Sequence, residues 1–493
     1  MRLAAVLVSL FLTFAAVAQQ PLKSDTIDRA ITTTQTAWKL PGIAVAIVRN
    51  DRVIYAKGFG VKDLGSDNPV TADTTFQIAS NSKAFTTAAL AMLVDDGKLS
   101  WDDPVRQYVD YFRLADPCAE SMVTVRDTVS HRTGLSRHDE LWDNAPWSRE
   151  EVLRKIGQVK LNKPFRTAYQ YNNIMFIAAG EVVSHAANMP WDDFVRTRLF
   201  QPLGMNSTFT EDAKWQSADH ATGYRYDWKK ERISMQPPID TNTLGAAGAI
   251  KSTARDMAQW VRLQLNNGVI DGKRLISEDA LNETKMPQTV IRLEKLSRDT
   301  NPESNVMAYG MGWNIQDYRG ELLVSHGGAL NGFRSHVDLL PRRGTGFVIL
   351  TNVGRGMANV ALRNTLIDIL LGYPRRDWNA YYLMVDRKAD EADAKEIEER
   401  NAKRIPNTQP SHPLADYAGE YESPAYGTAI VTLVDNALVL QWSRMHLPLT
   451  HFHYDVFNAV SEPDDVDEQV TFGIGAEGKV KTLTFFGETF TRK

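Results

Sequence analysis

The stretch FQIASNSKAFTTAALAML, residues 76–93, carries a helical pattern of apolar residues and the first candidate for chemistry. Apolar residues recur in it at the spacing i, i+3, i+4, i+7 and i+8, at Phe85, Ala88, Ala89, Met92 and Leu93. This period predicts a buried helix that begins near Ser80. Ser80 and Lys83 form an S-x-x-K tetrad, the only one in the chain. On a helix, the two residues stand one turn apart on the same face.

This geometry suits a covalent nucleophile. A serine hydroxyl is a poor nucleophile until an adjacent base accepts its proton, and a desolvated lysine can be that base. The N-terminus of the helix also favours the negative charge that develops on an acyl oxygen. The tetrad alone is weak evidence, because a helix-capping serine beside an exposed lysine has the same letters.

A second motif, Tyr171-Asn172-Asn173, stands directly before the helical run 174–183. A tyrosine hydroxyl that is held near two cations can act as a general base, provided that the site lowers its pKa from the usual value of about 10. By itself the Y-x-N spacing is common and is usually structural.

A third motif follows the strand-like run 322–325, at His326, Gly327, Gly328 and Ala329. A strand in this place can run alongside a substrate. The N–H of Ala329 together with the N–H of Ser80 would then form an oxyanion hole. The alternative for His326 is a polar histidine at a strand end.

The order S-x-x-K, Y-x-N, H-G-G resembles that of the class C β-lactamases and their relatives, the D-alanyl-D-alanine carboxypeptidases, D-aminopeptidases and family VIII esterases. The resemblance covers residues 25–370. It extends to phrases that flank the motifs, at 58–60, 76–80, 130–135, 202–205, 245–248, 252–256 and 332–333. The phrase Tyr417-Ala-Gly-Glu-Tyr421 resembles a lipocalin-like domain that is often attached to such hydrolases.

The resemblance implies a role for each motif residue. Ser80 would be the acylated nucleophile, Lys83 and Tyr171 would exchange its proton, Asn173 would orient the substrate amide, and Ala329 would share the oxyanion hole. One departure matters, because the β-lactamases of this class carry Lys-Thr-Gly where this chain has His326-Gly327-Gly328. A fixed positive charge and a hydroxyl donor for a substrate carboxylate are therefore missing.

The expected activity is hydrolysis of an ester or amide through an acyl-enzyme. Three substrate classes stay open: small peptides with D-residues, peptidoglycan fragments and short acyl esters. A true β-lactamase is one alternative, and a penicillin-binding sensor that acylates without turnover is another. Neither a metal nor an organic cofactor is expected. The expected partner is a small-molecule or peptide substrate, and the oligomeric state stays open.

Composition excludes several other classes. The chain has 493 residues, which is too long for one core, and its 43% apolar and 24% charged residues are typical of a globular protein. A net charge of −4 without a basic stripe argues against nucleic acid as a partner. The single cysteine, Cys118, excludes an intrachain disulfide and metal sites built on several thiolates.

The first residues predict export. Met1-Arg2 precede an apolar run that ends in Ala16-Val17-Ala18, as in a cleaved signal peptide of residues 1–18. The mature protein would be periplasmic or secreted, without stable membrane insertion. We expect a β-lactamase-like serine hydrolase domain at 19–375, a charged helical linker at 376–410 and a C-terminal β domain at 411–493. Within the linker, the charged run 389–403 is expected to be a solvated helix.

The strand signals predict an α+β fold. A hairpin is expected at 43–58 around Asn50-Asp51, and strands return at 322–325, 335–340 and 346–351. Strands at both ends of a domain, with helices between them, indicate one antiparallel sheet flanked by helices, as in a β-lactamase or transpeptidase. Alternating runs at 428–434, 438–442, 470–472 and 480–485 predict an all-β, lipocalin-like C-terminal domain.

Other patterns are weaker. Gly134-Leu-Ser136-Arg-His138 lacks the second glycine of a G-x-S-x-G elbow. His138 and Asp139 are better explained as part of a loop that lines the cleft than as two members of a triad. His451 and His453 have no third metal ligand nearby and are interpreted as structural or surface residues.

Overall fold

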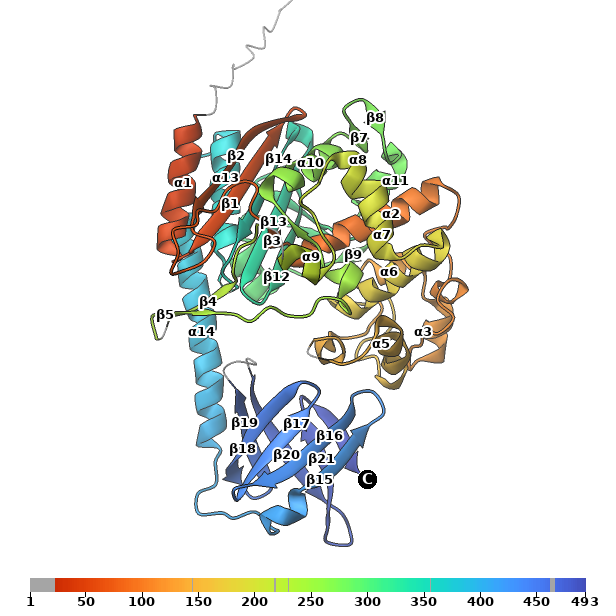
Figure 1. Ribbon diagram of the computed structural model, residues 1–493, viewed down its shortest axis with the longest axis vertical. Helices are drawn as coiled ribbons and strands as arrows, with labels where there is room; N and C mark the ends of the chain where they lie inside the picture. The colour runs from red at the N-terminus through yellow and green to blue at the C-terminus, as the bar shows by residue number, and fades with distance from the viewer. Residues whose placement is uncertain (1–22, 144, 217–218, 229, 355, 462–465) are drawn as a thin grey trace, which may run out of the picture.

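The computed structural model describes residues 23–493 except 144, 217–218, 229, 355 and 462–465. The predicted signal peptide, residues 1–18, lies outside these described residues. In the part of the chain that is described, no helix is long and apolar enough to cross a membrane. Figure 1 shows a main domain, residues 24–371, and a C-terminal barrel that is joined to it by one long helix.

An eight-stranded antiparallel sheet forms the centre of the main domain, in the order β2-β1-β14-β13-β12-β11-β10-β9. Its strands are β1 (Gly42–Arg49), β2 (Arg52–Gly60), β9 (Thr289–Val290), β10 (Met307–Tyr309), β11 (Asn314–Tyr318), β12 (Glu321–Leu330), β13 (Phe333–Leu340) and β14 (Thr345–Thr351). The first hairpin turns at Asn50 and Asp51, which both have the positive φ that a tight two-residue turn requires. Since β1 pairs with β14, the sheet is completed by both ends of the domain, which confirms the predicted fold class.

Side chains alternate between the two faces of this sheet and build two cores. Ile43, Val45 and Ile47 of β1 belong to the core beneath α1 (Ser24–Ala37) and α13 (Ala358–Leu371). The residues between them on β1 face the other core, which includes residues of α2 (Ser82–Asp95) and α10 (Ala254–Leu265). This second face carries the site described below, because α2 begins there.

The segment between β2 and β10 supplies the helices that cover the second face (Figure 1). The apolar helices α2 and α6 (Asn173–Ala187) pack against each other, and nearly every side chain of α2 is buried. The shorter helices of this segment are α3 (Pro117–Met122), α4 (Val125–Thr128), α5 (Arg149–Lys155), α7 (Trp191–Val195), α8 (Gln201–Leu203), α9 (Asp212–Gln216), α11 (Glu278–Glu283) and α12 (Lys295–Thr300). Three two-stranded ribbons complete it: β3 (Phe76–Gln77) with β6 (Lys251–Ser252), β4 (Tyr224–Asp227) with β5 (Arg232–Met235), and β7 (Val269–Ile270) with β8 (Lys273–Arg274).

The connecting helix differs from the sequence-based expectation. Helix α14 runs from Trp378 to Ala402, so it begins well before the charged run at 389–403. Trp378, Tyr382 and Val385 are buried at the spacing i, i+4, i+7, and Trp378 and Tyr382 belong to the core beneath α13. The expectation of a solvated helix therefore holds for the charged second half of α14, whereas its first turns are part of the main domain.

The C-terminal part is a closed barrel of eight antiparallel strands, in chain order. They are β15 (Gly419–Ser423), β16 (Gly427–Val434), β17 (Ala437–Trp442), β18 (Met445–His453), β19 (Val456–Ser461), β20 (Val466–Ile474), β21 (Val480–Phe485) and β22 (Glu488–Arg492). Alternate residues point inward, as the alternating sequence predicts, and the barrel core is rich in aromatic rings such as Trp442 and Phe472. The expected lipocalin-like domain is therefore a closed β-barrel.

Candidate active site

Ser80 lies at the junction between β3 and α2, in a short 3-10 turn, Ala79–Asn81, that leads directly into the helix. Ala79 has φ 49°, a left-handed conformation that non-glycine residues rarely adopt outside strained functional turns. The turn is held from the sheet side by Ser335 of β13, whose hydroxyl donates to the Ile78 carbonyl over 2.6 Å and accepts from Asn81 Nδ2 over 2.7 Å. Ser80 itself remains partly exposed and lines a pocket.

Lys83 lies one turn further along and is completely buried. Its Nζ lies 3.1 Å from Ser80 Oγ, 2.7 Å from Asn173 Oδ1 and 2.7 Å from the Ala247 carbonyl oxygen. Among the described residues no carboxylate forms an ion pair with it. Burial lowers the pKa of Lys83 well below its usual value, against the opposing charge of Asp139.

The three contacts of Lys83 determine how the N–H groups and the lone pair of a neutral amine would be oriented. Asn173 Oδ1 and the Ala247 oxygen can only accept hydrogen bonds, so they take two N–H groups of the amine. A neutral amine then has one remaining position, and Ser80 Oγ occupies it. The lone pair of a neutral Lys83 is therefore directed at the proton of the Ser80 hydroxyl.

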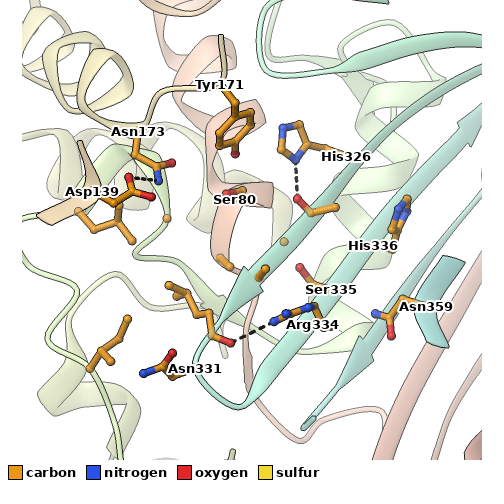
Figure 2. Close-up of a pocket in the computed structure, with 18 of the residues that line it drawn as sticks. Ser80, Asp139, Tyr171, Asn173, His326, Asn331, Arg334, Ser335, His336 and Asn359 are labelled. Atoms are coloured by element: carbon orange, nitrogen blue, oxygen red, sulfur yellow. Dashed lines mark hydrogen bonds between the residues drawn. The ribbon is translucent and has the colours of Figure 1, made fainter. Parts of the chain in front are cut away.

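Tyr171 stands over the same serine (Figure 2) and is packed among aromatic rings. Its ring lies 4.2 Å from that of His131 and its centroid 5.0 Å from Lys83 Nζ. Burial raises the pKa of Tyr171, while a hydrogen bond with Ser80 and the charge of Arg137 oppose the rise. The phenol is thus protonated in the resting site. Burial thus opposes a base formed by lowering the pKa of Tyr171, and the exchange of the Ser80 proton with Tyr171 stays a prediction.

Asn173 is the first residue of α6, and the preceding Asn172 caps this helix by accepting from the Met175 N–H over 2.9 Å. The side chain of Asn173 has a partner at each end. Its Oδ1 accepts from Lys83, and its Nδ2 donates to Asp139 Oδ1 over 3.0 Å (Figure 2). One N–H of its amide is left for a substrate, so the role expected for Asn173 stays a prediction.

The H-G-G motif lies on β12, close to the turn that carries Ser80. A Cβ on Gly328 would lie 2.2 Å from the Ile78 carbonyl oxygen, so only glycine permits the strand to approach the turn this closely. Gly327 is less tightly packed, because a Cβ there would lie 3.4 Å from its nearest neighbour, the His336 ring. The second glycine of the motif is therefore required by packing, whereas a side chain at the first would meet its neighbours at ordinary contact distance.

Ala329 has a backbone N–H that is directed away from β13. Leu330 and Phe333 flank the two-residue turn between β12 and β13, so they form a hydrogen-bonded pair. Pairs alternate along an antiparallel ladder, and Ala329, opposite Arg334, therefore turns its N–H to the other edge. Because β11 pairs with β12 only as far as Ser325, that edge is open to the pocket.

His326 is buried, and both of its ring nitrogens have partners within the protein. Nδ1 lies 2.7 Å from the Gly327 carbonyl oxygen and Nε2 lies 2.9 Å from the Tyr309 hydroxyl. These contacts are satisfied when Nδ1–H donates to Gly327 and Nε2 accepts from Tyr309. Burial and the nearby Lys83 lower the pKa of His326 to about 3, so its imidazole is neutral at physiological pH.

These elements enclose a pocket of about 590 Å³, a volume suited to a small ligand. Figure 2 shows Tyr171 and His326 near Ser80, with Asp139 on one wall and Arg334, His336 and Asn359 on the other. Of the residues proposed from the sequence, all but Lys83 line this pocket, and Lys83 reaches it through its bond to Ser80.

Several residues of the site were missed by sequence reasoning. Arg137 lies over the Tyr171 ring and donates to Asp139 over 2.8 Å. His336 lines the pocket, and its Nδ1 lies 2.8 Å from Asp338 Oδ2. The spacing of His336 and Asp338 on one strand face was available as a signal, whereas nothing local marked Arg137. Asp139 lines the pocket, which confirms the interpretation of its loop.

No group of three or more His, Cys, Asp or Glu side chains that could hold a metal ion occurs in the described part of the chain. His453 Nδ1 accepts from the Ile405 N–H over 3.3 Å, and His451 Nε2 lies 2.9 Å from the Tyr454 carbonyl oxygen. Both histidines therefore have structural contacts in or near the barrel.

Comparison with protein families gives two matches. The Beta-lactamase family matches residues 27–371, and a domain of unknown function (DUF3471) matches residues 403–492. The first match contains every candidate residue of the site. The second contains the barrel and the last part of the segment before it.

Individual proteins are similar as well. The unguisins hydrolase ungD′ of Aspergillus campestris is 31% identical over 424 residues, which are 82% of this chain and 77% of that protein. Protein flp of Staphylococcus aureus is 25% identical over 317 residues, 64% of this chain and 60% of that protein.

Solved structures share the fold. The octameric penicillin-binding protein homologue from Pyrococcus abyssi has a TM-score of 0.61 at 20% identity, covering 94% of this chain and 98% of its own. A penicillin-binding protein from Bacillus halodurans has a TM-score of 0.56 at 22% identity, covering 68% of this chain and 98% of its own.

Proposed function

Since this chain belongs to the Beta-lactamase family and is a serine hydrolase of that superfamily, we propose that Ser80 is its nucleophile and that its substrates are uncharged short esters or amides. Small peptides with D-residues are included among the amides. The observation that carries the proposal is the buried Lys83, whose Nζ contacts the Ser80 hydroxyl, the Asn173 amide oxygen and the Ala247 carbonyl oxygen, and which forms no ion pair among the described residues.

The proposed reaction has two halves. Ser80 Oγ attacks the carbonyl carbon while its proton moves to Lys83 Nζ. The oxyanion accepts from the N–H groups of Ala329 and Ser80. The C–O or C–N bond then breaks, and the leaving group takes a proton from the Tyr171 hydroxyl, which is replaced by the proton held on Lys83. Water hydrolyses the resulting ester of Ser80 and restores the free serine.

The preference for uncharged substrates follows from the H-G-G segment. His326 is neutral and both of its nitrogens are already bonded, so it offers no cation to a substrate carboxylate. Gly327 has no hydroxyl. A charge-assisted hydrogen bond contributes about 1.5 to 3 kcal/mol. Because both the cation and the hydroxyl are missing, the binding of a β-lactam carboxylate is weakened by more than the value of one such bond.

Turnover distinguishes this proposal from the sensor alternative. The relative from Aspergillus campestris is named as a hydrolase, which supports release of the acyl group rather than stable acylation. A p-nitrophenyl ester would show steady release beyond one equivalent per protein. Release that stops at one equivalent would support the sensor.

A substrate panel tests the specificity. We expect kcat/KM for p-nitrophenyl esters or D-amino-acid amides to exceed that for nitrocefin by at least about a hundredfold. The double variant His326→Lys/Gly327→Thr should narrow this ratio. Gly327→Thr alone is the control, because it adds the hydroxyl without the charge. The protein should tolerate this substitution, since a Cβ at 327 would lie 3.4 Å from the His336 ring. Equal rates on nitrocefin and the best ester would support the β-lactamase alternative instead.

A further inference from the structure

The barrel reaches the loop that lines the active-site pocket. We define this pocket loop as residues 136–142, which include the 3-10 turn Asp139–Leu141. Tyr426 stands in the turn between β15 and β16, and its hydroxyl lies 2.5 Å from His138 Nδ1 of the pocket loop. Figure 1 shows this part of the barrel below α5, on the side of the helical part of the main domain.

We infer that the barrel contributes a positioning residue, Tyr426, which holds the pocket loop through His138 and thereby keeps Asn173 and Lys83 in the geometry needed to acylate Ser80. The inference rests on the proposed function, because it assumes that Lys83 activates Ser80. It assigns to the barrel a part in catalysis without any contact between the barrel and the substrate.

The Tyr426 contact is enclosed and directional. Tyr426 is 2% exposed, and its ring packs against Trp442 and Phe490 inside the barrel. Burial lowers the pKa of His138 and raises that of Tyr426, so both groups are neutral. All the partners are satisfied when the Tyr426 hydroxyl donates to Nδ1 and Nε2–H donates to Ser136 Oγ, which is 2.7 Å away.

One route from His138 to the site passes through Ser136. The Ser136 carbonyl oxygen accepts a hydrogen bond from Asn172 Nδ2. Asn172 is the capping residue of α6 and stands between Tyr171 and Asn173. A pocket loop that moved would therefore release the side chain that fixes the start of α6 and the two motif residues beside it.

The second route passes through Asp139, the neighbour of His138 in the chain. Asp139 Oδ1 accepts from Trp142 Nε1 over 2.7 Å and from Asn173 Nδ2 over 3.0 Å. Asn173 in turn presents its Oδ1 to Lys83. The position of Asp139 thus determines the orientation of the Asn173 amide. The amide oxygen of Asn173 is one of the two acceptors that orient the Lys83 nitrogen.

The pocket loop needs an external support. His138 has φ 45°, in the left-handed region that is unfavourable for a residue with a Cβ. Such a conformation persists only where surrounding contacts hold it, and the two ring nitrogens of His138 supply these contacts at Tyr426 and Ser136.

Two further contacts join the barrel to the pocket walls. A Cβ on Gly427 would lie 3.1 Å from the Trp147 ring, and the Trp147 carbonyl oxygen accepts from the Thr243 hydroxyl over 2.8 Å. Arg444 lies 3.6 Å from Asp240. Asp240 follows the pocket-lining Ile239 and Thr243 precedes the pocket-lining Leu244, so the barrel also contacts the segment 239–244 directly at Asp240 and through Trp147 at Thr243.

The test removes one hydroxyl in the full-length protein. Tyr426→Phe keeps the ring and loses the bond to His138, and His138→Asn breaks the same bond while keeping a residue type that tolerates a left-handed φ. Tyr421→Phe is the matched control, because its buried hydroxyl donates only within the barrel, to the Tyr417 carbonyl oxygen over 2.8 Å. The readouts are fluorophosphonate labelling of Ser80, resolved into a maximal rate constant and a half-saturating concentration, and hydrogen exchange of residues 136–142.

We expect the maximal rate constant to fall about threefold to tenfold in Tyr426→Phe and in His138→Asn, the effect of one lost hydrogen bond. The double variant should be no slower than the slower single variant, since both lose the same bond. The half-saturating concentration should change less than twofold, and Tyr421→Phe should stay within twofold of the wild type. Exchange in residues 136–142 should accelerate only in the first two variants.

Two results would overturn the inference. One is a labelling rate for Tyr426→Phe within twofold of the wild type, and the other is an equal loss in Tyr421→Phe, which would indicate general weakening of the barrel. A wild-type protein that fails to label at Ser80 would contradict the proposed function alone. Hydrogen exchange would then still decide whether Tyr426 holds the pocket loop.

Discussion

Among the residues of the main domain whose burial the structure describes, two lysines are completely buried, and their surroundings differ in one respect. Lys251 of β6 forms an ion pair with Asp212 Oδ1 over 2.5 Å and donates to the Thr241 hydroxyl and the Thr210 carbonyl oxygen. Lys83 of α2 has a similar number of contacts at similar distances, but each is with a neutral group.

The comparison shows how the fold separates a structural lysine from a reactive one. Burial lowers the pKa of both side chains, and at Lys251 the contact with Asp212 opposes this effect directly. At Lys83 the opposing carboxylate, Asp139, is reached only through the Asn173 amide. The amine at 83 is therefore available as a base, whereas the ammonium at 251 holds two segments of the chain together.

The largest expected effect is on activity at Lys83. Lys83→Met removes the general base and should lower kcat/KM about a hundredfold to ten-thousandfold, while the protein remains folded. The measurement is ester hydrolysis together with circular dichroism. Activity of Lys83→Met within tenfold of the wild type would remove this lysine from the mechanism.

The same substitution at Lys251 should act on stability instead. Lys251→Met leaves Asp212 without its buried partner and should lower the free energy of unfolding by about 3 kcal/mol, measured in urea. The labelling rate per folded molecule should stay within threefold of the wild type. Adding Asp212→Asn is the control, because it removes the uncompensated charge and should restore part of the loss. If the urea concentration at the midpoint of unfolding is the same for Lys251→Met and the wild type, the ion pair has no structural role.

A smaller effect concerns how stability depends on pH. The pKa of Lys83 is lower in the folded than in the unfolded state, so between the two values the unfolded chain binds more protons and stability rises with pH. Relative to Lys83→Met, the wild type should gain stability as the pH rises toward about 10.4, the ordinary pKa of a lysine. A difference that stays constant over this range would mean that Lys83 is charged in the folded protein.

The parts of the fold that could be predicted from the sequence are those set by local patterns. The spacing of Ser80 and Lys83 alone places both side chains on one helical turn. Asn50-Asp51 marks the first hairpin, and the alternation at 428–434 indicates a barrel strand. These features depend on residues a few positions apart, where backbone geometry is the deciding factor.

The parts that could not be predicted depend on contacts between distant positions. His138 and Tyr426 are 288 residues apart, and no local signal joins them. The tetrad singled out Lys83, but no local signal showed that Lys251 is buried in an ion pair with the distant Asp212. For the same reason the sequence could not show that Asn173 is held by Lys83 and Asp139 at opposite ends of its amide.

The proposal that a neutral Lys83 activates Ser80 is tested by the pH dependence of Ser80 labelling with a fluorophosphonate, followed by intact-mass and peptide mapping. With a neutral Lys83 as base, the adduct should map to Ser80, be absent in Ser80→Ala, and form at a rate that levels off below pH 9. If Lys83 had its ordinary pKa of about 10.4, the rate would rise about tenfold per pH unit through pH 9. Such a rise, or an adduct that persists in Ser80→Ala, would contradict the account.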